Sequence, residues 1–208
     1  MNINLFKTRN YSGKLIVYEG IDGSGKSTVA KAVAVALRLP TAGFTAHYLF
    51  EPTNNHYGRM LRSAAASGKR FSVHEEAALF VKDRVANRDA NLLPALMSGH
   101  IVNLDRYFHS SIAYQGVSGL APETVFEMNK PVILDADLVL IFEVPVETAL
   151  ARIHTNRDST TAFETKEFLE KTEAVYQSFE ADNIRRIDST QSLPYVLTQV
   201  LQLVRGIL

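Results

Sequence analysis

The chain has 208 residues, and its 22 Lys and Arg residues balance its 22 Asp and Glu residues, so the formal net charge is zero. This balance excludes the broad positive field with which proteins hold a nucleic-acid backbone or an anionic membrane surface, and we expect neither partner. The absence of cysteine excludes a disulfide framework, thiolate–zinc clusters and cysteine nucleophiles, and it favours a cytoplasmic location.

Residues 1–13 form a short polar extension ahead of the first predicted strand. They contain no apolar run long enough for a signal peptide or a membrane span. The remaining residues, 14–208, are enough to bury a sizeable core, and no repeat or low-complexity linker divides them. We therefore expect an N-terminal extension followed by a single domain.

Short apolar runs alternate with longer segments of helical period along this domain. The alternation predicts an α/β fold in which a five-stranded parallel sheet is covered by helices on both faces. The expected strands lie near residues 14–18, 44–50, 100–104, 138–144 and 184–187.

A glycine-rich segment, GIDGSGKST over residues 20–28, follows the first strand and leads into a helical run over 29–39. It fits the P-loop pattern at every constrained position. Glycines let backbone N–H groups face the phosphates of a nucleotide, Lys26 reaches the β- and γ-phosphates, and Ser27 can coordinate Mg²⁺. The alternative is a glycine-rich turn without catalytic meaning, against which the strand, the helix and the Lys-Ser pair all argue. The candidate ATP-binding residues here are Gly20, Asp22, Gly23, Ser24, Gly25, Lys26, Ser27 and Thr28.

Polar residues also follow the second and third strands. The second strand runs into Glu51-Pro52, and the third runs into Asp105-Arg106. Ligands of open parallel sheets bind beyond the carboxyl ends of the strands, so both segments can face the P-loop. Asp105 can hold Mg²⁺ directly or through water, and Arg106 can clamp a phosphate. A surface ion pair between the two is the alternative.

Between these two strands lies a helix whose start is marked by Ser72 and Glu75, the pattern of a capping box. We expect it to run to about residue 93, before a proline. Phe80, Arg84 and Arg88 are spaced four residues apart and share nearly one face of this helix. An aromatic ring and guanidinium groups can hold a flat, carbonyl-rich base. The alternatives are that Phe80 belongs to the core and that Arg88 is a solvated or paired charge.

With these pieces in place, the chain resembles the thymidylate kinase family of P-loop nucleoside monophosphate kinases over nearly its whole length. The resemblance rests on four segments: YEGIDGSGKST at 18–28, ALFVKDR at 78–84, DRYFHSSIAYQG at 105–116 and IDSTQS at 187–192. It implies a P-loop NTPase three-layer fold with a lid at about residues 153–165. It also implies transfer of the γ-phosphoryl group of ATP to dTMP, with Mg²⁺ as cofactor, in a homodimer.

The resemblance implies a role for each residue of the acceptor site. Phe80 stacks on thymine, Arg84 bonds the carbonyl edge of the base, and Arg106 contacts the acceptor phosphate. Asp22 lies near the sugar 3′-hydroxyl, and Tyr114 crowds the 2′ position. Two more residues line the base and sugar pocket: Ser111 and Gln115. For the last three, a capping or solvated hydroxyl and ordinary packing between helices remain the alternatives.

The resemblance also implies roles for two arginines that follow the fourth strand. Arg152 lies on a helix that begins near Pro145 and packs on adenine. Arg157, in the polar lid segment beyond it, stabilises charge on the transferring phosphoryl group; the alternative is a pairing with its neighbour Asp158 or exposure to solvent. The 187–192 segment lies beside the adenine of ATP.

The sequence departs from the family pattern at two positions. Phe50 stands where bacterial relatives commonly carry an arginine that clamps phosphate, and Ala162 stands where a lid arginine is common. Arg59 and Arg62 are candidate substitutes for the first. These departures leave open a kinase for another deoxynucleotide or deoxynucleoside, or a regulator that binds ATP without turning it over. The catalytic candidates argue against the regulator: Lys26, Asp105, Arg106 and Arg157.

Overall fold

The computed structural model describes residues 10–68, 71–156, 163 and 165–208. Within these ranges, five strands form one parallel sheet with the strand order β2-β3-β1-β4-β5. The strands are β1 (Lys14–Glu19), β2 (Ala46–Phe50), β3 (Ile101–Asp105), β4 (Leu138–Glu143) and β5 (Ile184–Asp188). Each begins and ends within two residues of its predicted position, so the predicted α/β class and the five-stranded parallel sheet are confirmed.

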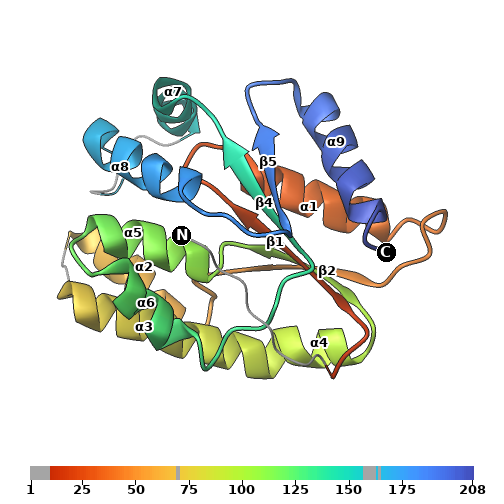
Figure 1. Cartoon of the computed structure of the whole chain (residues 1–208), viewed down its shortest axis with the longest axis horizontal. Helices are drawn as coiled ribbons and strands as arrows, with labels where there is room; N and C mark the ends of the chain where they lie inside the picture. The colour runs from red at the N-terminus through yellow and green to blue at the C-terminus, as the bar shows by residue number, and fades with distance from the viewer. Residues whose placement is uncertain (1–9, 69–70, 157–162, 164) are drawn as a thin grey trace.

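Helices cover both faces of this sheet. Their bounds are α1 (Lys26–Leu37), α2 (His56–Ser67), α3 (Val73–Asn87), η1 (Arg88–Leu92), α4 (Leu93–Met97), α5 (Phe108–Val117), α6 (Pro122–Asn129), α7 (Val146–Asn156), α8 (Lys166–Gln177) and α9 (Leu193–Arg205). Figure 1 shows α1 and α9 together on one side of the sheet and α3 to α6 on the other. None of these described helices is both long enough and apolar enough to cross a membrane.

The central strand shows why two helical layers form. Successive side chains of a strand point to opposite faces, so each residue of β1 enters one of two cores. Leu15 and Val17 pack into the core beneath α3, α4, α5 and α8, whereas Ile16 and Tyr18 pack against α1 and α9. All four side chains are fully buried, as expected for a parallel strand covered on both faces.

The helix that begins at Ser72 confirms one prediction and corrects another. The capping box is present: the Ser72 side chain accepts from the backbone N–H of Glu75, whose side chain accepts from that of Ser72. The predicted end near residue 93 was wrong, because the helical path continues through η1 into α4. In the π turn of η1, the N–H of Leu93 donates to the carbonyl of Arg88, five residues back. Pro94, which has no N–H to donate, follows as the second residue of α4.

The carboxyl ends of β1, β2 and β3 meet at one edge of the sheet. Asp105 pairs in register with Tyr18 of β1 and with Phe50 of β2. The order of the strands reverses around β1, and in such sheets the ligand crevice lies where the order reverses. This edge therefore holds the P-loop and both polar segments that follow the neighbouring strands.

Candidate active site

The P-loop connects β1 to α1 and makes a cradle that depends on its glycines. Gly20 and Gly23 have positive φ angles of 135° and 79°. A Cβ atom at Gly23 would lie 2.3 Å from the carbonyl oxygen of Ala149, so a larger residue cannot fit there. Gly25 precedes α1 as its N-cap, which brings the positive end of the helix to the cradle.

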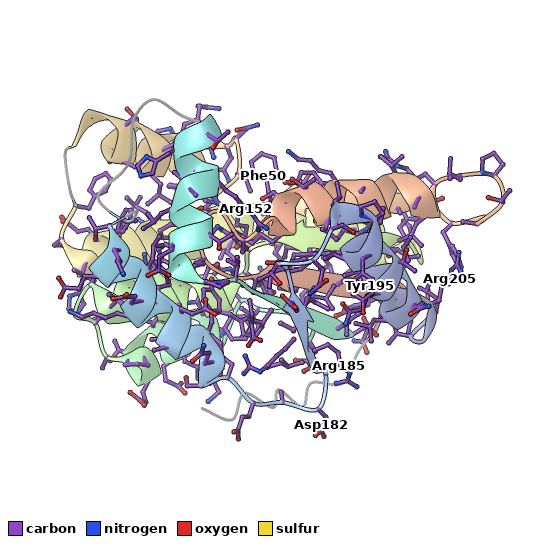
Figure 2. The ribbon with its side chains drawn as sticks, turned by 90° about the horizontal axis from the view of Figure 1, so that it is seen from above. Phe50, Arg152, Asp182, Arg185, Tyr195 and Arg205 are labelled. Carbon is purple, nitrogen blue, oxygen red and sulfur yellow. The ribbon has the colours of Figure 1, made fainter. Side chains whose placement is uncertain are left out.

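A pocket of about 660 Å³ opens over this cradle. Arg152 reaches it from α7 (Figure 2), where its Nη1 donates to the carbonyl of Gly23 at 3.3 Å and its Nη2 donates to that of Ser189 at 2.9 Å. The structure thus brings together the P-loop, Arg152 and the 187–192 segment, as the sequence predicted. The residues that line this pocket are Asp22, Gly23, Ser24, Gly25, Lys26, Ser27, Thr28, Val29, Lys31, Phe142, Arg152, Ile153, Ser189, Gln191, Leu193 and Val196.

Lys26 is almost completely enclosed at the floor of this pocket, with 4% of its surface exposed. Its Nζ donates to the carbonyl of Ile21 at 3.1 Å. Burial lowers the pKa of Lys26 to about 8, and the nearby Arg106 guanidinium adds to this effect, while the carboxylates of Asp22 and Asp105 oppose it. The ammonium group therefore lies where an added negative charge would stabilise it.

Asp22 and Arg106 form the boundary between this pocket and a second one. Arg106 Nη2 donates to Asp22 Oδ1 at 2.8 Å and to the hydroxyl of Tyr114 at 3.2 Å. The Tyr114 hydroxyl in turn donates to Asp22 Oδ2 at 3.1 Å. Burial opposes ionisation of Asp22, but the charges of Arg106 and Lys26 and the hydrogen bonds from Arg106 and Tyr114 together outweigh it and hold the pKa of this carboxyl well below its usual range. The three side chains thus form one charged, hydrogen-bonded unit, rather than the surface pair between Asp105 and Arg106 that was the alternative.

The backbone of Arg106 is held by Glu19, a residue that the sequence reasoning missed. Arg106 has a φ of 68°, a conformation that is uncommon for a residue other than glycine. The fully buried Glu19 carboxylate accepts from the next backbone N–H, that of Tyr107, at 2.7 Å. It also accepts from the hydroxyls of Ser110 at 2.5 Å and Tyr176 at 3.0 Å. A glutamate at the end of an otherwise apolar strand was the signal that could have found it.

One oxygen of the Asp105 carboxylate can still accept a hydrogen bond or bind a cation. The side chain is 5% exposed, and its Oδ2 accepts from the hydroxyl of Tyr48 at 2.9 Å. Its Oδ1 is buried without a hydrogen-bond partner among the described residues. A buried acceptor of this kind favours a cation, since leaving it unpaired is costly. Within the described ranges no group of three or more His, Cys, Asp or Glu side chains could hold a metal ion. Mg²⁺ usually takes one or two protein ligands beside phosphate oxygens and water.

The second pocket, of about 190 Å³, lies on the other side of Asp22 and is called the acceptor pocket below. It brings together all six residues that were assigned to the base and sugar from the resemblance. Its lining residues are Asp22, Glu51, Pro52, Leu61, Arg62, Ala65, Glu76, Phe80, Arg84, Arg106, Tyr107, Ser110, Ser111, Tyr114, Gln115 and Phe163. The half-buried Phe80 faces this pocket and does not belong to either core cluster.

Arg84 is held in this pocket by a buried ion pair. It is 1% exposed, and its Nε donates to Glu51 Oε2 at 2.8 Å. It also donates to Asn129 Oδ1, and its Nη2 donates to the Ser111 hydroxyl at 3.3 Å. Burial raises the pKa of Glu51 despite the opposing charge of Arg84. The alternative for Ser111, a capping or solvated hydroxyl, does not hold, since its side chain is buried against this guanidinium.

The two arginines that were candidate substitutes for the phosphate-clamping arginine at position 50 lie in different places. Arg62 lines the acceptor pocket, where its Nη1 donates to the carbonyl of Pro52 at 2.6 Å. Arg59 does not line it and instead donates to the carbonyl of Asn54. Phe50 (Figure 2) stacks on Tyr48 with 6.0 Å between ring centroids. Arg88 pairs with Asp89 at 2.7 Å and does not line the acceptor pocket, which agrees with the alternative that it is a paired charge.

Most of the predicted lid lies outside the described residues, and so do Arg157 and Ala162. Phe163 is described, and its ring centroid lies 6.2 Å from that of Tyr114, within the lining of the acceptor pocket. The sequence reasoning did not assign this residue to the site. Its aromatic side chain in a segment expected to close over substrate was the available signal.

Comparisons with known proteins agree with the geometry. A family model described as thymidylate kinase matches residues 18–200. The chain is 38% identical over 193 residues to a thymidylate kinase of Brachyspira hyodysenteriae, covering 93% of this chain and 94% of that protein. It is 39% identical over 191 residues to thymidylate kinases of Xanthomonas euvesicatoria and Xanthomonas oryzae, covering 90% of this chain and 81% of each relative.

Proposed function

The chain belongs to the thymidylate kinase family, and on that premise we propose that its two pockets hold the two substrates of one phosphoryl transfer. ATP binds over the P-loop, and dTMP binds in the acceptor pocket with its phosphate toward Asp22 and Arg106. The γ-phosphoryl group of ATP passes to dTMP, giving dTDP and ADP. The resemblance drawn from the sequence and the family model lead to the same reaction.

One observation carries this assignment: Asp22 lines both pockets. Phosphoryl transfer needs its donor and acceptor held in line more than it needs covalent chemistry. The P-loop sets the position of the polyphosphate, and Arg106 lies where the acceptor phosphate would enter from the other side. A phosphate oxygen of dTMP is already an anionic nucleophile, so no strong general base is required.

The charged residues around this junction have distinct roles in the proposal. Lys26 stabilises the β- and γ-phosphates, and its buried position makes that interaction stronger than it would be in water. Arg106 orients the acceptor phosphate, and the hydrogen bonds of Asp22 and Ser110 to its guanidinium fix its direction. Arg157, which lies outside the described residues, remains our candidate for the cation that arrives from the lid.

Ser27 and Asp105 would hold Mg²⁺. The Ser27 hydroxyl belongs to the lining of the P-loop pocket, and Asp105, which lines neither of the two pockets, supplies the unpartnered Oδ1; both are hard oxygen ligands of the kind that this ion prefers. When bound, Mg²⁺ offsets the charge of the β- and γ-phosphate oxygens. Tyr48 keeps the Asp105 carboxylate in place through its hydroxyl.

The remaining assignments stay predictions that follow from the sequence. These are the single domain over residues 14–208 behind a 13-residue extension, the homodimer, and the cytoplasmic location. For the acceptor pocket, we propose that Phe80 stacks on thymine, that Arg84 and Ser111 face a carbonyl of the base, and that Tyr114 excludes a 2′-hydroxyl.

A substrate panel tests the function. ADP release is coupled to NADH oxidation with ATP, Mg²⁺ and each nucleoside monophosphate in turn, and kcat/KM is measured for each acceptor. We expect dTMP to be preferred and dUMP to be weaker. If dAMP, dGMP or dCMP exceeded dTMP, the enzyme would be a kinase for another deoxynucleotide. If no acceptor supported ADP release while ATP still bound, the chain would be an ATP-binding regulator.

A further inference from the structure

Glu76 contacts Gln115 in the wall of the acceptor pocket. Glu76 lies on α3, one helical turn before Phe80, and Gln115 lies on α5. Gln115 Nε2 donates to Glu76 Oε2 at 3.2 Å. The Gln115 side chain is 1% exposed, and its Oε1 is buried without a hydrogen-bond partner among the described residues. Both residues line the pocket. Because the Nε2 group of the Gln115 amide already donates to Glu76, the group of this amide that remains unused is its carbonyl oxygen.

A carboxylate partner leaves the amide only one favourable orientation. A glutamine amide can accept through Oε1 and donate through Nε2, and a 180° turn about its last torsion exchanges the two groups. An ionised carboxylate can only accept hydrogen bonds. If the Gln115 amide turned by 180°, its Oε1 would face the carboxylate oxygens of Glu76, and two acceptors would lie against each other. Leaving buried acceptors opposed in this way is costly. Glu76 therefore keeps an acceptor, and not a donor, available on the Gln115 side chain.

The bases of pyrimidine nucleotides differ at the group that such an acceptor would meet. Thymine and uracil carry a hydrogen on ring nitrogen N3 with a carbonyl on each side, whereas N3 of cytosine has a lone pair beside an amino group. Arg84 and Ser111 supply the complementary donors: Arg84 has five N–H groups, and the Ser111 hydroxyl keeps its own hydrogen while it accepts from Arg84. The pocket thus offers donors to a carbonyl and one fixed acceptor to a ring N–H.

We propose that Glu76 is a positioning residue that determines base specificity, because it fixes the Gln115 amide so that the pocket accepts a base with a ring N–H and rejects one with a ring acceptor. The inference rests on the proposed function, which places a pyrimidine nucleotide in this pocket. Glu76 acts through Gln115 and needs no contact with the base. The selected class is the 5′-monophosphates of thymine and uracil nucleosides, and the rejected class is that of cytosine.

The test is Glu76→Gln, which keeps the shape of the side chain but lets residue 76 either donate or accept. Both orientations of the Gln115 amide then find a partner, so the pocket can offer a donor to cytosine N3. We expect kcat/KM for dCMP to rise and the dTMP-to-dCMP ratio to fall by at least about tenfold. The kcat with saturating dTMP and the KM for ATP should change little, because the phosphate end of the site is untouched. The dTMP-to-dUMP ratio should stay constant, since both bases carry the N3 hydrogen.

Glu75→Gln is the matched control. It changes the neighbouring, exposed glutamate of α3, and glutamine retains the capping-box interaction with Ser72. Its nucleotide ratios should equal those of the wild type. A loss of activity toward every acceptor in Glu76→Gln, with no gain for dCMP, would show that Glu76 only supports the fold and would overturn the inference. An unchanged dTMP-to-dCMP ratio would overturn it while the proposed function stood, whereas a wild-type enzyme that failed with dTMP would overturn both.

Discussion

The ammonium group of Lys26 is enclosed by the P-loop. With 4% of its surface exposed, it has lost most of its hydration, and its Nζ donates to the neutral carbonyl of Ile21. This burial is the main reason that its pKa falls to about 8. A polyphosphate brings the negative charge that the buried cation lacks, so proton binding at Lys26 and ATP binding should favour each other.

This coupling predicts a pH dependence for ATP binding. Below about pH 8, Lys26 is already charged, and ATP affinity should be nearly constant. Above about pH 8, Lys26 must regain its proton when ATP binds, so the affinity for ATP should fall as pH rises. For the same reason, ATP binding at pH 8.5 should take up protons. Isothermal titration in buffers of different ionisation enthalpy measures that uptake. In Lys26→Arg, the guanidinium stays charged, and the uptake should disappear whatever the remaining affinity. A flat affinity between about pH 7 and pH 9.5 in the wild type would contradict the assignment.

A site role could be predicted from the sequence for residues that belong to a local pattern. It could not be predicted for residues whose partner lies far away in the sequence. Phe80 and Arg84 were found from helical spacing and resemblance together, and both line the acceptor pocket. Glu76 was missed because its partner Gln115 lies 39 residues away on another helix, and no spacing in one chain reveals that contact. Glu19 was missed for the same reason: the groups that it accepts from lie on the β3–α5 segment and on α8.

The strands were predictable as elements because their environment leaves a clear signal. A parallel strand covered on both faces is mostly apolar, and β1, β3 and β4 are apolar except at their ends and at Asn103. The helix from Ser72 shows where such signals fail. Its proline predicted an end, but the π turn at η1 lets the helical path continue to Met97. A one-residue change in hydrogen-bond spacing has no signature in the pattern of apolar residues.

The lid element carries a prediction about Arg157, which lies outside the described residues. The P-loop positions between Gly20 and Gly25 include no Arg or Lys, so a second cation beyond Lys26 must come from elsewhere. If Arg157 stabilises charge on the transferring phosphoryl group, Arg157→Ala should lower kcat on the order of 10³-fold. Affinity for dTMP and the melting temperature should change little. Steady-state kinetics, titration with dTMP and thermal melting measure the three quantities.

Arg185→Ala supplies the control for that substitution. Arg185 lies on β5 (Figure 2), is exposed, and donates to the carbonyls of Asp182 and Ile184, so its removal should leave kcat unchanged. Exposed surface interactions of this kind contribute less than about 1 kcal/mol. A fully active Arg157→Ala would exclude this residue from the mechanism. Arg152, which already contacts the P-loop carbonyl of Gly23, would then be the remaining candidate.

Across the whole molecule, the two pockets are built by different parts of the chain and meet at one wall. The P-loop pocket is lined by α1, α7 and the start of α9, and the acceptor pocket is lined by α2, α3 and α5. Asp22 belongs to both linings, and Arg106 binds it from the acceptor side. The sheet holds the two sets of helices in a fixed relation, because β1 carries the P-loop and its neighbour β3 carries Arg106.

This shared wall predicts that one ligand can occupy both pockets. Adenosine and thymidine joined 5′ to 5′ by a polyphosphate chain should bind more tightly than ATP by a factor on the order of 10² to 10⁴, because the second nucleoside binds at a high effective concentration. At equal ligand concentration, the melting temperature should rise further with this ligand than with ATP alone, because the tighter ligand stabilises the folded protein more. The control is the same chain with adenosine at both ends, which offers a purine to an acceptor pocket of only about 190 Å³ and should gain much less. Titration calorimetry and thermal melting compare the two ligands. If the adenosine–thymidine ligand bound no more tightly than ATP, the pockets would not open toward each other at Asp22, and the transfer path proposed between them would have to be abandoned.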